Sequence, residues 1–278
     1  NIKNNKTYSA EEIRRANDIA NPALDKIWAM QWLSDCIHKK DEAKIETYNE
    51  YVSTLTQTYE VILVVAGREE RASIKAVIDL FDPKEGYPEI VFMPLNFSIS
   101  DYASVLRRLE NKTVALLAVS IMEESLELRC AYSVAKHFVT SQANKAKISP
   151  EICVIYSERS RTIKEDAFEN EYTKIEVSHR TDPSYLANTD PVIFILKLMG
   201  ADVEAYIRGL YDCVSAPEWD TNLPLIAYRM IEFENKGIIV ESWQKEYEEI
   251  AKWFARPDIR ASHRQIQMPS LSLDNECL

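Results

Sequence analysis

The chain has 278 residues, of which 46% are hydrophobic and 28% charged, as in ordinary globular proteins. Acidic residues outnumber basic ones by 44 to 33, and the formal net charge of -11 disfavours nucleic acid and anionic membranes as partners. No apolar run approaches the roughly 20 residues that a membrane span needs. The first residue is Asn1, with no signal peptide, which indicates that the start has been trimmed or processed.

The cysteines and histidines indicate neither a disulfide framework nor a metal site. Five cysteines lie far apart without a C-x-x-C pair, and four histidines have unrelated spacings. We therefore expect reduced thiols, a cytoplasmic protein, no metal and no cofactor. Glycine is scarce, with five residues where average usage predicts about twenty, so glycine-rich phosphate loops are not expected.

The first part of the chain has a helical pattern. Ser9 and Glu12 form the S-x-x-E pattern of a capping box, which predicts a helix that begins at Ala10. Pro22 is expected to separate this helix from a second one. A further helix is predicted at 41–58, which completes a helical N-terminal segment over 1–58.

From residue 61 the pattern changes to short apolar runs that alternate with helical segments. Strands are predicted at 61–66, 90–93, 114–119, 152–156 and 174–177, with helices at 69–81, 100–109, 123–139 and 162–170 between them. Continuous apolar, β-branched runs are typical of strands that are buried on both faces. The sequence thus predicts an α/β three-layer sandwich around a five-stranded parallel sheet.

After residue 178 the pattern is helical again. Helices are expected at 188–199, 202–213, 222–235 and 244–254, with a short strand at 238–241 and a polar, extended tail from 256 to 278. No internal repeat is present.

Four segments carry a resemblance to a known family. They are YEVILVVAGREERASIKAVIDLF from Tyr59, PEIVFMPLNFSISDYASVLRRL from Pro88, LMGADVEAYIRGLYDC from Leu198 and NLPLIAYRMIEFENKGIIVESW from Asn222. In order and texture they resemble the first sugar-isomerase (SIS) domain of the phosphoglucose isomerase family, over 59–254. The resemblance implies an SIS-type fold at 59–236, with 237–278 as the beginning of a second domain plus a tail. It also implies a sugar or sugar phosphate as ligand.

The resemblance further implies two loops that bind the sugar phosphate, and both are altered here. Where the family has G-I-G-G-S after the first strand, this chain has residues 66–70, with Gly67 as the only glycine and two glutamates after it. Where the family has S-K-S-G-T-T-T-E, residues 120–127 read SIMEESLE. Ser120 and Ser125 keep hydroxyls, while Glu123 and Glu124 replace a glycine and a threonine.

Two interpretations of these glutamates remain open. Each carboxylate about 4 Å from a phosphate would cost roughly 1 kcal/mol in water and about 4 at an effective dielectric constant of 20. Alternatively, Glu123 and Glu124 favour the N-terminus of their own helix. Under either interpretation the phosphate site is expected to be closed.

The catalytic residues that the resemblance implies are missing. The arginine motif G-G-R-Y-S corresponds to 182–186, where only Tyr185 is kept; Arg180 lies upstream beyond a proline. The segment 252–262, which would carry the catalytic glutamate, has none, and the later histidine and lysine motifs have no counterpart. A positioned base contributes about 10²–10⁴-fold to such a reaction, and His263 is expected to be solvated. No catalytic residue is predicted.

Ligands of open parallel sheets bind at the carboxyl ends of the strands. Among the loops there, residues 157–161 form the only polar, basic turn, so Ser157, Arg159 and Ser160 are a candidate anion site. The alternative is an ordinary exposed turn in which Ser160 caps the next helix. Together with Gly67, Ser120, Ser125 and Tyr185, these residues form the predicted weak ligand site.

Three functions are compatible with these observations. The first is a catalytically degenerate isomerase-like protein that serves as a binding or assembly scaffold. The second is an active aldose–ketose isomerase that interconverts glucose 6-phosphate and fructose 6-phosphate with unrecognised residues or a partner chain. The third is a sensor of a non-phosphorylated sugar, for which an acid-rich rim of Glu69, Glu70, Glu123 and Glu124 would suit a positive charge.

We also expect a homodimer. The strand at 238–241 would need a partner strand, and the last predicted helix carries an aromatic surface. That surface consists of Trp243, Tyr247, Trp253 and Phe254.

Overall fold

The computed structural model describes residues 9–28, 42–178, 181–187, 189–215 and 245–255. The chain divides into two compact units. One comprises residues 40–204, and the other comprises 1–39 together with 205–278. The predicted helix at 222–235, the strand at 238–241 and the tail at 256–278 lie outside the described residues, as do Arg180 and His263.

A five-stranded parallel sheet forms the centre of the unit 40–204. Its strands are β1 (Val61–Ala66), β2 (Glu89–Phe92), β3 (Val114–Ser120), β4 (Ile152–Tyr156) and β5 (Thr173–Glu176). Their order is β2-β1-β3-β4-β5, and every neighbouring pair is parallel. Val61 pairs with Glu89 on one side and Val114 on the other. The predicted α/β fold with a five-stranded parallel sheet is confirmed.

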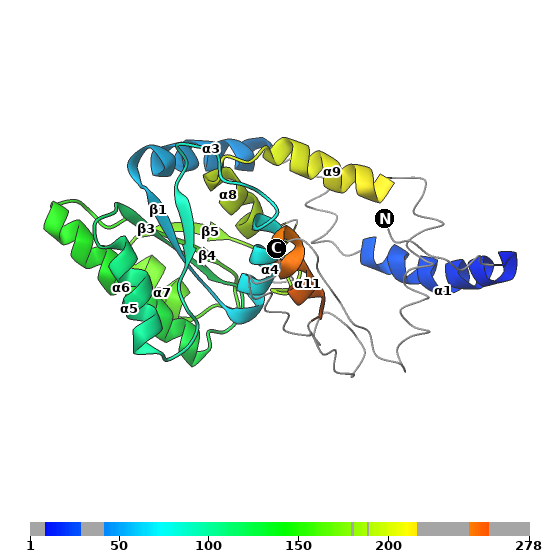
Figure 1. The fold of residues 1–278 in the computed structure, drawn as a ribbon, viewed down its shortest axis with the longest axis horizontal. Coiled ribbons are helices and arrows are strands. Elements are labelled where there is room, and N and C mark those ends of the chain that lie inside the picture. The colour runs from blue at the N-terminus through cyan, green and yellow to red at the C-terminus, as the bar shows by residue number, and fades with distance from the viewer. Residues whose placement is uncertain (1–8, 29–41, 179–180, 188, 216–244, 256–278) are drawn as a thin grey trace, which may run out of the picture. The chain divides into compact units, whose positions relative to one another are not determined.

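Helices cover both faces of this sheet (Figure 1). They are α3 (Glu42–Thr58), α4 (Arg68–Ile78), α5 (Ile99–Leu109), α6 (Leu126–Ala146), α7 (Thr162–Glu169) and α8 (Asp190–Leu198). Helix α8 packs against α3 and α4 on one face. On the other face, residues of α5, α6 and α7 share one apolar core with β1, β3 and β4. The result is the predicted three-layer sandwich.

The central strands explain why the sheet forms. Every residue of β1, β3 and β4 is buried, and β1 is at most 2% exposed. Strands that are covered on both faces need such continuous apolar runs. The two edge strands, β2 and β5, are less buried, as their shorter and more polar sequences EIVF and TKIE require.

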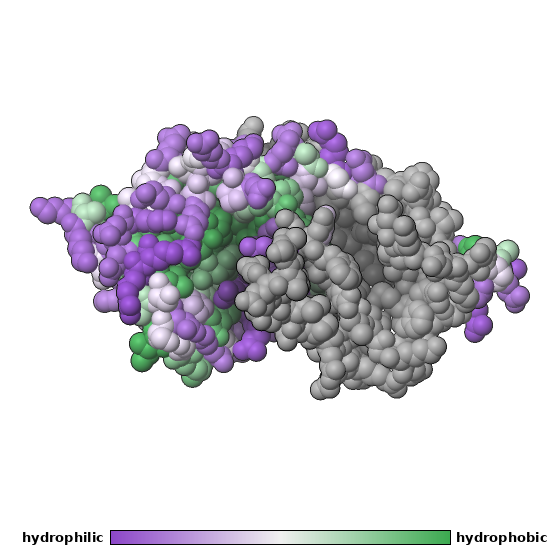
Figure 2. Space-filling view, in the orientation of Figure 1, coloured by the Kyte–Doolittle hydropathy of each residue, from purple (hydrophilic) through white to green (hydrophobic). Residues whose placement is uncertain are grey.

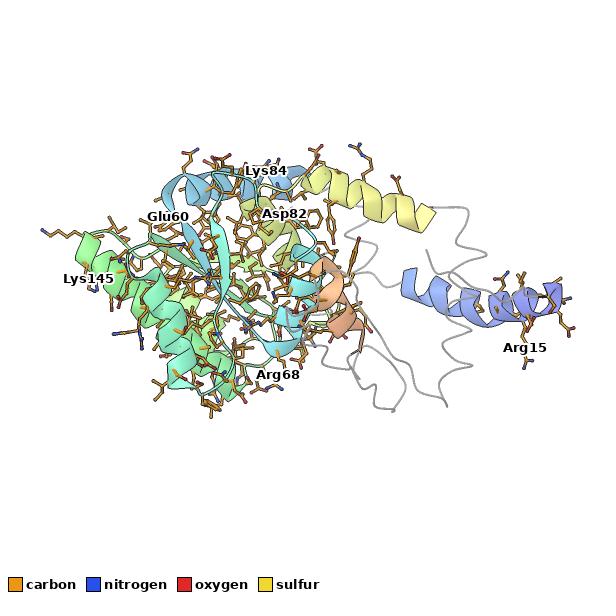
Figure 3. All side chains as sticks on the ribbon, viewed as in Figure 1. Arg15, Glu60, Arg68, Asp82, Lys84 and Lys145 are labelled. Carbon is orange, nitrogen blue, oxygen red and sulfur yellow. The ribbon has the colours of Figure 1, made fainter. Side chains whose placement is uncertain are left out.

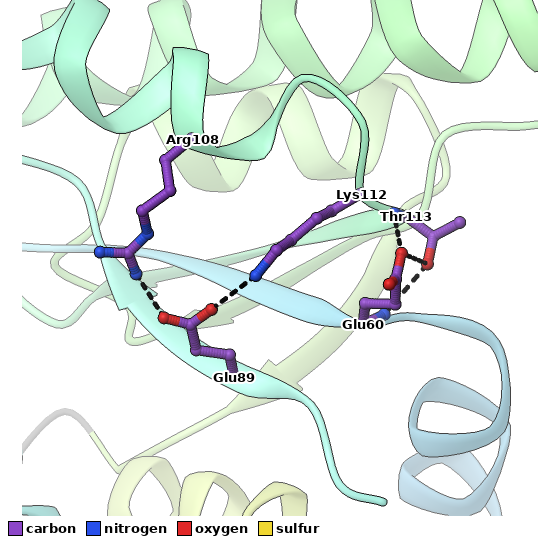
Figure 4. A network of polar contacts seen from close by, with 5 residues as sticks. All are labelled: Glu60, Glu89, Arg108, Lys112 and Thr113. Atoms are coloured by element: carbon purple, nitrogen blue, oxygen red, sulfur yellow. Dashed lines mark hydrogen bonds and ion pairs between the residues drawn. The ribbon is translucent and has the colours of Figure 1, made fainter.

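The amino edge of the sheet is held by an exposed polar network (Figure 4). The Glu60 N–H donates to Thr113 Oγ1 at 3.0 Å, and the Thr113 N–H donates to Glu60 Oε2 at 2.9 Å. Glu89 forms ion pairs with Arg108 and with Lys112 Nζ, the latter at 2.9 Å. These contacts join the start of β1 and of β2 to the turn before β3. Figure 3 labels Glu60 at this end of β1 and Arg68 just beyond its other end.

Several helix boundaries differ from the prediction, and two of these differences have a clear local cause. Helix α6 begins at Leu126 and not at 123, because the Ser125 hydroxyl accepts a hydrogen bond from the Leu128 N–H at 3.2 Å and caps the helix. In the other unit, α1 (Ala10–Trp28) continues through Pro22. The expected break there is wrong, since a proline removes one N–H and can kink a helix without ending it.

The remaining described elements belong wholly or mostly to the second unit. Helix α9 (Val203–Ser215) begins two residues before it, and a short 3₁₀ turn, η1 (Lys245–Tyr247), precedes α11 (Glu248–Ala255). The capping box of α1 is confirmed: the Ser9 N–H donates to Glu12 Oε2 at 2.9 Å, and the Glu12 N–H donates to Ser9 Oγ at 3.2 Å. None of the described helices is both long enough and apolar enough to cross a membrane.

Candidate functional site

The connections of the sheet define where a ligand would bind. Helix α4 follows β1 on one face, whereas α6 follows β3 on the other face. The two connections diverge between the carboxyl ends of β1 and β3, and such a switch point is the usual ligand crevice of an open α/β sheet. Here it lies between residues 67–70 and residues 121–125.

The Glu70 side chain lies buried at this switch point. Glu70 is only 3% exposed although it belongs to the first turn of α4. The Ile121 N–H, just beyond β3, donates to its Oε1 at 3.4 Å, so one carboxylate spans the switch point. A Cβ added at Gly67 would collide with the same carboxylate. Because Gly67 has no side chain, the Glu70 carboxylate can lie against its Cα.

Burial raises the pKa of Glu70 above its ordinary value. Hydrogen bonds from backbone N–H groups, among them those of Ile121 and Met122, lower it in part, while the nearby Glu69 raises it. The dominant cause is the loss of water around the charged form. A carboxylate with this property at a switch point is able to exchange a proton closer to neutral pH than an exposed glutamate.

Glu124 lies in a second buried cluster, next to this crevice. Its Oε1 accepts hydrogen bonds from Ser120 Oγ at 3.0 Å and Ser160 Oγ at 2.8 Å. The backbone N–H groups of residues 161–163 donate to the same carboxylate at 3.0 to 3.2 Å. Glu124 is 7% exposed. Its carboxylate thus caps the N-terminus of α7, a helix that begins 38 residues further along the chain.

This geometry corrects one expectation about the glutamates. Glu124 does not serve the N-terminus of its own helix α6, where Ser125 is the cap. Burial alone raises the pKa of Glu124, but hydrogen bonds from Ser160, Ile163 and Ser120, together with its own backbone, outweigh it and leave the pKa lowered. The neighbouring Glu123 is exposed and pairs with Arg161 at 3.4 Å. Of the four glutamates that were expected to form an acid-rich rim, Glu70 and Glu124 are therefore buried.

Polar groups of the turn at 157–161 form hydrogen bonds with other segments of the protein. Ser157 Oγ donates to the Ile121 carbonyl at 2.5 Å and accepts from the Arg159 N–H at 3.1 Å. The Arg159 guanidinium donates to the Thr181 carbonyl at 2.6 Å. Ser160 does not cap α7 as expected, because its hydroxyl donates to Glu124, and Glu124 makes the capping contacts. These hydrogen bonds hold the turn that follows β4 against the loop that follows β3.

The structure gathers only part of the predicted ligand site. Ser120 and Ser160 lie 2.9 Å apart, oxygen to oxygen, and Ser157 contacts the same loop. Tyr185 belongs to a separate segment, whose next residue, Leu186, donates its N–H to Ser73 Oγ of α4 at 2.7 Å. Sequence reasoning missed the inward placement of Glu70 and Glu124. Position in the sequence does not separate them from their neighbours, since Glu69 and Glu123 follow the same strands without being buried.

No metal centre is evident in the parts of the chain described above: no three His, Cys, Asp or Glu side chains there are grouped to hold an ion.

The order of the strands and the helices on both sides of the sheet are those of an SIS-type α/β fold. No protein-family model and no curated protein matches the sequence. Solved structures do match. The hypothetical protein TT0462 from Thermus thermophilus has a TM-score of 0.71 and covers 88% of this chain. A glucose-6-phosphate isomerase from Chlamydia trachomatis has a TM-score of 0.61 over 77% of this chain.

A tagatose-6-phosphate ketose/aldose isomerase from Escherichia coli is also similar, with a TM-score of 0.53 over 88% of this chain. All three are 14% identical to it, a level at which the likeness establishes the fold alone. The chain spans 61%, 42% and 62% of their respective lengths. It thus corresponds to less than two thirds of each of these proteins.

Proposed function

We propose that this chain is a degenerate, phosphoglucose-isomerase-like SIS protein that acts as a binding or assembly scaffold. One observation carries the proposal: the Glu70 carboxylate is buried at the switch point between β1 and β3 and accepts a hydrogen bond from the Ile121 N–H. The altered loops at 66–70 and 120–127 agree with it. So does the absence, among the residues aligned with the family motifs, of a catalytic arginine or glutamate.

The electrostatics of the crevice support a closed site. A phosphate group about 4 Å from an ionised Glu70 would lose roughly 4 kcal/mol per unit charge at an effective dielectric constant of 20, which is about three powers of ten in affinity. The ligand would also have to displace the carboxylate from the Ile121 N–H. The displaced carboxylate would lose this donor, and a buried acceptor without its donor costs a further 1–3 kcal/mol, roughly.

Calorimetric titration of the full chain with glucose 6-phosphate and with fructose 6-phosphate tests the proposal. A coupled isomerase assay is run on the same sample, with an active glucose-6-phosphate isomerase as the positive control. We expect neither heat of binding nor turnover. Binding accompanied by turnover would show that the crevice opens and would refute the scaffold role.

A second candidate function is aldose–ketose isomerisation, and the raised pKa of Glu70 favours it. A base that moves a proton between neighbouring sugar carbons works best when its pKa lies near the working pH. If the assay detects turnover, Glu70→Gln should abolish it while Glu69→Gln, on the adjacent residue, retains it. Turnover that survives Glu70→Gln would exclude Glu70 as the base.

A further inference from the structure

Buried polar side chains are concentrated at the carboxyl ends of the strands. Among the residues that the structure describes, Glu70 and Glu124 are the only charged ones that are buried. On the face drawn in Figure 2, hydrophilic residues lie over the helices at the surface of the unit 40–204. The hydroxyls of Ser120, Ser157 and Ser160 are buried beside the two glutamates. Buried polar groups are costly unless each has a partner, so the hydrogen bonds among them fix the arrangement of these loops.

Ile121, the first residue after β3, links two of the other connections. Its N–H donates to Glu70 Oε1 at 3.4 Å, and its carbonyl oxygen accepts a hydrogen bond from Ser157 Oγ at 2.5 Å. The residue itself is fully buried, so water does not replace either partner. The backbone of Ile121 thus contacts the start of α4 through its N–H and the turn after β4 through its carbonyl. A shift of this one residue would disturb both contacts.

Glu124 fixes the short segment 120–124 that contains Ile121. Ser120 Oγ donates to Glu124 Oε1 at 3.0 Å, so the two ends of the segment are joined to each other. The same carboxylate accepts hydrogen bonds from Ser160 Oγ and from the backbone N–H groups of residues 161–163, which belong to the start of α7. Because Ile121 lies between these two ends, the position of its N–H depends on the contacts of Glu124.

We propose that Glu124 is a positioning residue that holds the Ile121 N–H against Glu70, so that the two buried carboxylates keep the switch point closed cooperatively. The inference rests on the proposed function, since it concerns how the site stays closed. Hydrogen bonds that share one ordered segment support each other, because the conformational entropy of that segment is lost only once. To open the switch point, the segment 120–124 has to leave both carboxylates, and each of them opposes its movement.

Amide hydrogen exchange of the full chain, resolved by NMR at single residues, tests the inference. The amide of Val64, fully buried in β1, reports global unfolding and serves as the reference. In Glu124→Gln, the Ile121 amide should exchange roughly tenfold faster relative to Val64, which is typical of the coupling between groups in one hydrogen-bond network. The neutral amide of glutamine accepts hydrogen bonds less strongly than a carboxylate, and its NH₂ group faces donors.

The reverse experiment uses Glu70, because coupling between two sites is reciprocal. Glu70→Ala removes the acceptor of the Ile121 N–H and leaves every contact of Glu124 chemically intact. The Ile163 amide, which donates to Glu124 at 3.2 Å, should nevertheless exchange faster relative to Val64. This second variant keeps the inference testable if Glu124→Gln does not fold.

Asp166→Asn is the matched control. Asp166 also lies in α7, where its carboxylate accepts hydrogen bonds from Tyr132 Oη at 2.6 Å and from Lys136 Nζ at 2.6 and 2.8 Å. Both partners belong to α6 and not to the segment 120–124. This change should weaken the attachment of α7 and leave the exchange of Ile121 relative to Val64 as in the wild type.

Two results would overturn the inference: an unchanged ratio of Ile121 to Val64 exchange in Glu124→Gln, or an equal rise of that ratio in Asp166→Asn. The calorimetric titration separates this failure from failure of the proposed function. Coupled exchange together with isomerase turnover would refute the scaffold role and sustain the coupling. Uncoupled exchange without sugar phosphate binding would overturn the coupling alone.

Discussion

Glutamates have opposite environments at the amino and carboxyl ends of the β-strands, which we call the amino and carboxyl edges of the sheet. At the amino edge, Glu89 is partly exposed, with 43% of its side chain accessible, and it pairs with two cations near the surface. At the carboxyl edge, Glu70 and Glu124 are buried and are held mainly by backbone N–H and serine hydroxyl groups. Exposed ion pairs contribute little to stability, whereas a buried carboxylate whose donors lose their acceptor is expensive. The comparison predicts that substitutions at the carboxyl edge have the larger effects.

The largest effect is expected at Glu124. Glu124→Ala would leave the hydroxyls of Ser120 and Ser160 and the N–H groups at the start of α7 buried without their acceptor. Each buried donor that loses its acceptor in this way costs about 1–3 kcal/mol, so the free energy of unfolding should fall by several kcal/mol. Urea unfolding measures the loss. Glu123→Ala, one residue away and exposed, should change stability by less than about 0.5 kcal/mol; equal losses would refute the capping role.

A smaller loss is expected at Gly67. Gly67→Ala places a Cβ against the Glu70 carboxylate and should destabilise the chain by about 1–3 kcal/mol. The double variant Gly67→Ala/Glu70→Ala should lose less than the sum of the two single changes, because the collision disappears with the carboxylate. Additive losses would mean that Glu70 does not occupy the space above Gly67.

The two buried carboxylates should make opposite contributions to the pH dependence of stability. The folded-state pKa of Glu124 is lowered, so its contribution to stability is present above the unfolded-state pKa and is lost as the pH falls through the folded one. Glu70 has a raised folded-state pKa, so it favours folding at low pH and costs stability as the pH rises through that value. Glu70→Gln should therefore stabilise the chain at neutral pH and lose this advantage in acid.

Melting temperatures of the wild type and Glu70→Gln, recorded from acidic to neutral pH, provide the measurement. The matched variant Glu69→Gln should follow the wild type. A neutral-pH destabilisation by Glu70→Gln would show that the ionised form of Glu70 is favoured by its donors more than burial disfavours it.

The smallest effect is expected at the amino edge. Lys112→Ala removes one exposed ion pair to Glu89 and should cost about 0.2–1 kcal/mol, a loss that added salt should reduce further. Unfolding by urea at low and high ionic strength measures both features. A loss as large as that of Glu124→Ala would remove the contrast between the two edges.

Most of the fold could be predicted from local sequence. Every strand of the sheet was expected within about three residues of its observed bounds, because runs such as VILVVA indicate burial on both faces without reference to any neighbour. The capping box at Ser9 was predictable for the same reason, since its two partners are three residues apart. Pro22 was harder, because whether a proline ends a helix or only bends it depends on the residues around it.

The candidate site was decided by tertiary structure. Sequence alone indicated that the two loops keep only Gly67, Ser120 and Ser125 of the glycines and hydroxyls in the family they resemble, and that glutamates stand at other positions there. It did not determine where those carboxylates go. Glu124 finds its donors about 38 residues away at the start of α7, and Glu70 finds Ile121 about 51 residues away. Such partners meet only after the parallel strands have assembled, because each βα connection brings distant residues to one edge of the sheet.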